Sequence, residues 1–115
     1  MRFFTRKHLA VLIGMIFLFS NYAMADNPNR LSYVVENDQT FIKGMVFGLG
    51  EGIRTANVVA KVTKGVEIIC DPDDMRFSPD DYHNLLKTFY LKNSREDMSV
   101  SVAMHFALVE AFPCR

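Results

Sequence analysis

The spacing of apolar residues predicts four helices, and the clearest of them spans residues 79–92. The apolar stripe of this helix consists of Tyr82, Leu85, Leu86 and Phe89. These intervals of three and four are the period of one face of an amphipathic helix. Ser78 stands at the N-cap position, Pro79 follows at the first helical position, and Asp81 stands three residues after the serine, which is the pattern of a capping box. His83 lies one position off the stripe, so we expect it on the surface.

A second start signal of the same kind precedes the last predicted helix. Ser94 is followed three residues later by Asp97, and Pro113 marks the end of the helix. The expected apolar stripe consists of Met98, Val102, Phe106 and Val109. Because Asn93 and Ser94 leave room only for a tight connection, we expect this helix and the preceding one to pack as an antiparallel hairpin.

Two helices are predicted before these, a short one near residues 31–36 and a longer one over about 39–57. Asn37 and Asp38 separate the two and are good N-cap residues. Gly44, Gly48 and Gly52 recur every four residues in the longer helix. This interval places them on one face, where another helix can approach closely. A phosphate-binding loop would need a preceding strand and the full motif spacing. The glycine cluster has neither, so we interpret it as a packing face.

The pattern changes between residues 58 and 77. β-Branched residues predominate up to Ile69, Gly65 occupies an expected turn, and residues 66–69 are expected to run extended into Cys70. The acidic residues that follow are Asp71, Asp73 and Asp74. An EF-hand calcium loop also needs a further oxygen ligand, an invariant glycine and a distal glutamate, and these are absent from the segment. We therefore predict a solvated acidic loop and no metal site.

Residues 1–25 have the three parts of a cleaved signal peptide: a basic start, an apolar run over residues 9–19, and the small-residue pattern Ala23-Met24-Ala25. Three of the 13 Lys and Arg residues lie in this segment and none of the 13 Asp and Glu residues does. The predicted mature domain, residues 26–115, therefore carries a net charge of −3. This charge argues against nucleic acid or an anionic membrane as a partner, and the signal predicts export to the periplasm.

The two cysteines, Cys70 and Cys114, both fall in the mature domain. In an exported protein such a pair most simply forms a disulfide. Closing a loop of this length contributes on the order of 4 kcal/mol to a small domain. A catalytic or redox thiol would need a nearby base or a CxxC spacing, and the sequence has neither. The sequence thus predicts a small all-α, four-helix domain with one disulfide, with no cofactor and no enzymatic constellation.

Three stretches together resemble the Rap/Tai family of small periplasmic immunity proteins: FIKGMVFGLGEG, CDPDDMRFSPDDYHNLLKTFYL and MSVSVAMHFALVEAFPC. The most specific matches are Cys70 with Pro72, the final Phe-Pro-Cys that ends at Cys114, and Gly44 with Gly48. A second cysteine pair common in that family is missing here. The resemblance implies a helical fold, often dimeric, that binds and inhibits a peptidoglycan amidase toxin delivered by a type VI secretion system. An inter-helical loop would occlude the active site, and residues 63–77 and 92–97 are the candidates.

Two other functions remain open at the level of sequence. Small helical proteins with one disulfide also serve as periplasmic stress chaperones, or as binding proteins without a toxin partner. A chaperone would suppress aggregation of unrelated proteins near pH 3, whereas an immunity protein would protect only against its own toxin. We do not expect an enzyme, because no paired base, metal cluster or activated nucleophile is apparent.

Overall fold

The computed structural model describes residues 27–72 and 74–115. Its four helices are α2 (Leu31–Glu36), α3 (Thr40–Lys64), α4 (Pro79–Lys92) and α5 (Val100–Ala111). Within these ranges there is no strand, only two isolated bridges. The predicted all-α, four-helix fold with one disulfide is therefore confirmed. The predicted signal peptide lies outside the described residues, and none of the described helices is both long and apolar enough to cross a membrane.

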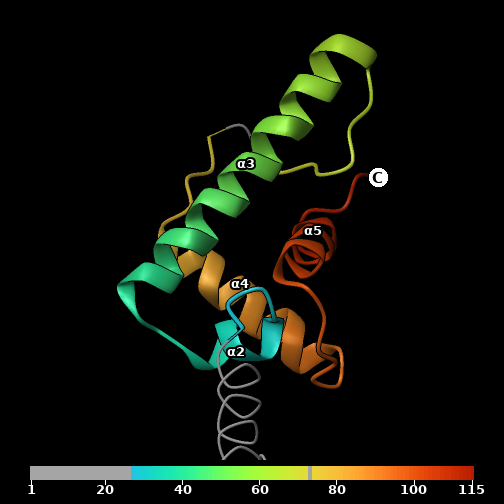
Figure 1. Cartoon of the computed structure of the whole chain (residues 1–115). Helices are drawn as coiled ribbons and strands as arrows, with labels where there is room; N and C mark the ends of the chain where they lie inside the picture. The colour runs from blue at the N-terminus through green and yellow to red at the C-terminus, as the bar shows by residue number, and fades with distance from the viewer. Residues whose placement is uncertain (1–26, 73) are drawn as a thin grey trace, which may run out of the picture.

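The hydrophobic core lies around the first half of α3. In Figure 1, α2, α4 and α5 gather around this half, and the second half of α3 extends beyond them. The largest fully buried side chains are Leu31, Val34, Val46, Ile69, Tyr82, Leu86, Met104 and Leu108. These residues come from all four helices and from the segment before Cys70, so a single core joins the whole described chain.

Helix α4 forms where the sequence predicts it. Ser78 caps it: the Ser78 hydroxyl accepts from the Asp81 backbone N–H at 3.1 Å, and the Asp81 carboxylate accepts from the Ser78 N–H at 2.7 Å. The expectation for His83 is wrong, because its side chain is only 3 % exposed. Its Nε2–H donates to the carbonyl oxygens of Val34 at 2.8 Å and Asn37 at 3.0 Å. His83 thereby ties α4 to the end of α2.

Helix α5 begins later than predicted, and Ser94 does not cap it. Ser94 has a left-handed backbone, with φ of 59°, and the N-cap is Ser99, whose hydroxyl accepts from the Val102 N–H. Asp97 instead accepts from the Ser32 N–H at 3.0 Å and pairs with Arg30. The connection therefore covers residues 93–99. In Figure 1, α5 is seen nearly end-on while α4 runs across the view, so the two helices cross and do not form the expected hairpin.

The predicted apolar stripe of α5 is wrong at two of its four positions, since only Met98 and Val109 pack against the core. Val102 and Phe106 are exposed, 47 % and 55 % respectively. The buried residues are Val100, Ala103, Met104, Ala107 and Leu108. Helix α5 itself carries apolar residues on nearly every side, so their period does not identify the face that meets the core.

Helix α3 is longer than predicted and ends at Lys64, where Gly65 adopts the left-handed conformation of a C-cap. At its start the N-cap is Gln39, not Asn37 or Asp38.

Among the described residues, the packing role predicted for the three glycines of α3 is not found. A Cβ added at Gly44, Gly48 or Gly52 would meet nothing within 4 Å. The close approach occurs instead at Gly50, which is buried and where a Cβ would overlap the ring of Tyr82.

Candidate functional site: the projecting arm

The most exposed apolar part of the described chain is a projection that we call the arm, residues 58–69. It consists of the last turns of α3, the turn at Gly65 and the segment that returns to Cys70. Figure 1 shows it extending past the other helices. Its exposed apolar side chains are Val58, Val59, Val62, Val66 and Ile68, each about half exposed or more. Isolated apolar side chains on a surface are ordinary, but several gathered on one projection are typical of a binding surface.

Asn57 fixes the returning segment against α3. Its side-chain oxygen accepts from the backbone N–H groups of Ile68 at 3.0 Å and Ile69 at 3.1 Å. Its side-chain nitrogen donates to the carbonyl oxygen of Ile69 at 2.8 Å. One carboxamide thus satisfies three backbone groups of a segment that has no sheet partner on that side. The arm is therefore held at a defined place in spite of its exposure.

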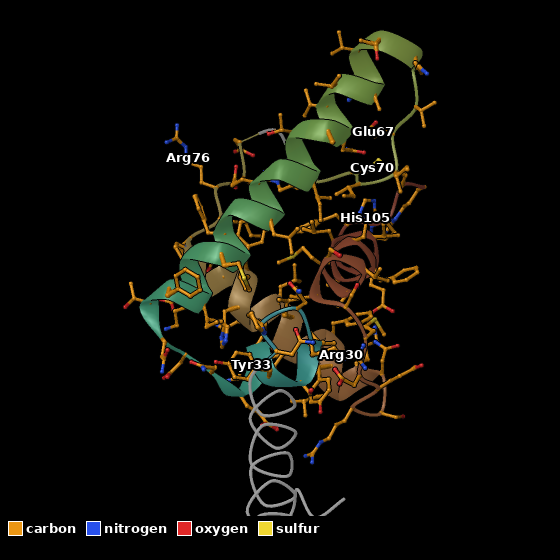
Figure 2. All side chains as sticks on the ribbon, viewed as in Figure 1. Arg30, Tyr33, Glu67, Cys70, Arg76 and His105 are labelled. Carbon is orange, nitrogen blue, oxygen red and sulfur yellow. A yellow bond between two sulfur atoms is a disulfide. The ribbon has the colours of Figure 1, made fainter. Side chains whose placement is uncertain are left out.

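The disulfide holds the same segment from the other side. Cys70 and Cys114 are bonded, with their Cα atoms 5.0 Å apart. The Cys70 N–H donates to the Phe112 carbonyl oxygen at 2.9 Å, and Ile69 forms an isolated antiparallel bridge with Pro113. Ile69 itself is buried. Figure 2 shows Cys70 between α3 and α5, with Glu67 farther along the returning segment toward the tip.

Beside the base of the arm, Arg54 organises the loop that follows Cys70. Its Nε and Nη2 donate to Asp71 Oδ2 at 2.8 and 2.6 Å, and its Nη1 donates to Glu51 at 3.1 Å. Nη2 also donates to the Met75 carbonyl oxygen, and the guanidinium lies 4.6 Å from the centre of the Phe77 ring. Asp71 is therefore not the solvated carboxylate that the sequence suggested. Because protein atoms occupy all three nitrogens, Arg54 acts here as a structural residue.

Tyr82 belongs to the same network. Its hydroxyl donates to Glu51 Oε1 at 2.6 Å and accepts from Arg54 Nη1 at 3.3 Å. Burial and the hydrogen bond to Glu51 raise the pKa of Tyr82 to about 12. The phenol thus stays protonated in neutral solution and links α3 to α4.

An open cleft of about 500 Å³ lies along this network between α3 and the loop, and its lining includes Phe47, Thr55, Val58, Met75 and Arg76. Figure 2 shows the Arg76 side chain pointing away from the helices. The charged groups that line the cleft, two carboxylates and two guanidinium groups, balance one another. The cleft therefore has no net charge with which to select an ionic ligand.

The other stretch considered for partner binding, residues 92–97, is folded back onto the helices. The Arg95 N–H donates to the Tyr90 carbonyl oxygen at 2.8 Å, and Asp97 is bonded to Ser32 and Arg30. Accepting the Ser32 backbone N–H holds the pKa of Asp97 below its usual value. Of the two candidate loops, only residues 63–77, which overlap the arm, project from the molecule.

Over residues 27–72 and 74–115, no three His, Cys, Asp or Glu side chains come together to hold a metal ion. Sequence reasoning missed Asn57, because its role depends on where the chain returns. It also missed Gly50, because nothing in the sequence around Gly50 distinguishes it from the exposed Gly44, Gly48 and Gly52.

No family model, curated protein or solved structure matches the chain. The resemblance to the Rap/Tai family thus stays a prediction from the three sequence stretches.

Proposed function

We propose that this protein is a periplasmic immunity-type protein that binds a peptidoglycan amidase toxin. It occludes the active site of the toxin with the tip of the arm, where Val66 and Ile68 lie. The single observation that carries the proposal is the tip itself. Val66 and Ile68 expose about half of their surface on a segment whose backbone is fixed by Asn57 and by the disulfide.

Rigidity and exposure together favour binding. Ordering a flexible loop at an interface consumes part of the interaction free energy, and a segment already held in place avoids this loss. A projection with exposed apolar side chains also has the shape to enter an enzyme cleft, where those side chains would lose contact with water. The amidase as target follows from the family resemblance, and the arm supplies a surface suited to that role.

The test is inhibition of amidase activity. The exported protein is mixed with each of a panel of type VI peptidoglycan amidase effectors, and release of peptide from peptidoglycan is measured. We expect inhibition of one effector, and we expect Ile68→Asp to weaken it at least tenfold, because the substitution places a charge in a buried contact. The matched control is Leu91→Asp, since Leu91 is similarly exposed on α4, away from the arm.

Failure to inhibit any effector of the panel would contradict the proposal, as would equal inhibition by Ile68→Asp and the unmodified protein. Suppression of aggregation of unrelated proteins near pH 3, without inhibition of any amidase, would indicate the chaperone function instead.

A further inference from the structure

A second hollow lies between the end of α2 and the second half of α4, apart from the cleft beside the arm. We call it the α2–α4 pocket, and its volume is about 260 Å³. Figure 1 shows α2 beside α4, and the hydrogen bond from His83 to the Val34 carbonyl oxygen holds the two helices together. The residues that give the pocket its chemistry come from α2, from α4 and from the connection after α4: Val35, Glu36, Lys87, Tyr90 and Arg95.

The polar groups of the α2–α4 pocket have no partners among the described residues. Glu36, Lys87 and Arg95 take part in none of the salt bridges of residues 27–72 and 74–115. The tyrosine hydroxyls that form hydrogen bonds in this part of the chain belong to other residues than Tyr90. In the cleft beside the arm, by contrast, Arg54 is fully engaged by protein atoms. The α2–α4 pocket therefore keeps two cations, a carboxylate and a phenol available to a ligand.

The backbone is strained where it supplies one of these cations. Ser94 and Arg95 both have left-handed backbones, with φ of 59° and 56°, a conformation that is unfavourable for residues with a Cβ atom. The Arg95 N–H donates to the Tyr90 carbonyl oxygen at 2.8 Å and thereby holds the turn. Glycine would relax either position, but only a side chain at position 95 brings a guanidinium to the pocket. Strained positions of this kind gather at functional sites.

From this arrangement we propose that the α2–α4 pocket binds a free amino acid with an apolar side chain. Lys87 and Arg95 bind the carboxylate of the ligand, and Glu36 binds its ammonium group. The apolar side chain of the ligand lies against Val35, which is only 5 % exposed, and against the ring of Tyr90. The pocket lies outside residues 58–69, so this inference does not depend on the proposed inhibition of an amidase.

The charges of the pocket select a zwitterion over other small ligands. A dicarboxylate or a phosphate would meet the two cations, but Glu36 would repel its additional negative charge. An apolar monocarboxylate leaves Glu36 without a partner, and an apolar amine leaves both cations without one. The volume is below the roughly 300–1,000 Å³ of sites for drug-sized ligands, which suits one amino acid better than a longer peptide.

Titration with L-leucine tests the proposal. Amide chemical shifts of the isotope-labelled exported protein are followed, and we expect saturable shifts at Val35, Tyr90 and Arg95 with a dissociation constant on the order of 1 mM. Three analogues each lack one part of leucine: 4-methylpentanoate the ammonium group, 3-methylbutylamine the carboxylate, and glycine the apolar side chain. Each is expected to bind at least about threefold more weakly. No saturable shift at these amides, or an analogue that binds as tightly as leucine, would overturn the proposal.

Variants assign the charged groups to the two ends of the ligand. In Glu36→Gln, leucine is expected to bind no more tightly than 4-methylpentanoate, because the ammonium group has lost its partner. In the double variant Lys87→Gln and Arg95→Gln, leucine is expected to bind no more tightly than 3-methylbutylamine. Lys64→Gln, at an exposed position in the last turn of α3, is the matched control and is expected to keep both preferences. Unchanged core amide shifts without ligand show that each variant is folded. Retention of both preferences in the folded pocket variants would overturn the assignment.

Discussion

The described chain consists of the arm and a base, which is the part outside residues 58–69. The two are held in place in different ways. Around Leu31, Tyr82 and Leu108 the base buries its apolar side chains completely. The arm leaves Val62, Val66 and Ile68 about half exposed or more, and its backbone is held by one asparagine, one glycine cap and the disulfide. Burial in the core stabilises the base, whereas the arm depends on a few point contacts. Such contacts free the side chains of the arm to meet another molecule.

The largest expected effect comes from the disulfide, which joins the two regions. Cys70 and Cys114 are 44 positions apart in sequence. Their double substitution to serine is expected to lower the free energy of unfolding by about 4 kcal/mol. Urea unfolding followed by circular dichroism checks this value. An unchanged unfolding midpoint would show that the core holds the returning segment without the bond.

The next largest effect is a difference in stability between substitutions at a buried and at an exposed glycine of α3. Gly50→Ala is expected to destabilise the base by about 1–3 kcal/mol, because the added methyl group overlaps the ring of Tyr82. Gly52→Ala, which meets nothing, is expected to stabilise the helix by about 0.5–1 kcal/mol. Thermal unfolding of the two variants measures the difference. Equal shifts of Tm would contradict the contact between Gly50 and Tyr82.

A smaller, local effect is expected in the arm. Asn57→Ala removes three hydrogen bonds of partly exposed groups, and we expect a loss of about 1 kcal/mol in the local stability of the arm. Trypsin cleavage after Lys61 and Lys64 should then be about fivefold faster. Asn93→Ala, which removes a single bond to Phe89 far from the arm, is the control. Equal cleavage of both variants would show that Asn57 does not hold the arm.

The smallest expected effect is the contribution of Asp97 to the pH dependence of stability. The Ser32 backbone N–H lowers the pKa of Asp97 in the folded protein below its ordinary value of 3.8. The carboxylate therefore contributes stability above that value, and the contribution is lost as pH falls through the lower, folded pKa. Asp97→Asn is expected to reduce the difference between Tm at pH 6 and Tm at pH 3. An identical difference in the variant would contradict this role of Asp97.

Sequence predicted those parts of the fold that local chemistry determines. The cap at Ser78 uses residues three positions apart, and the Tyr82 to Phe89 stripe needs only the helical period. Ser94 and Asp97 show a similar local signal, but Asp97 binds Ser32, which is 65 positions away in sequence. No local pattern distinguishes these two cases.

The candidate site was less predictable for the same reason. Asn57 becomes important only because the chain turns at Gly65 and returns past it. The four-residue interval of the glycines correctly indicated one helical face. It did not indicate that the other described segments would leave this face uncovered.

Native-state hydrogen exchange can establish whether the arm is held rigid while its apolar side chains stay uncovered. The amides of Ile68 and Ile69 donate to Asn57 Oδ1, so we predict slow exchange of both, well below the rate of an unfolded chain. Exchange of both amides at the unfolded rate, in a protein whose core amides stay protected, would show that the arm is not held rigid.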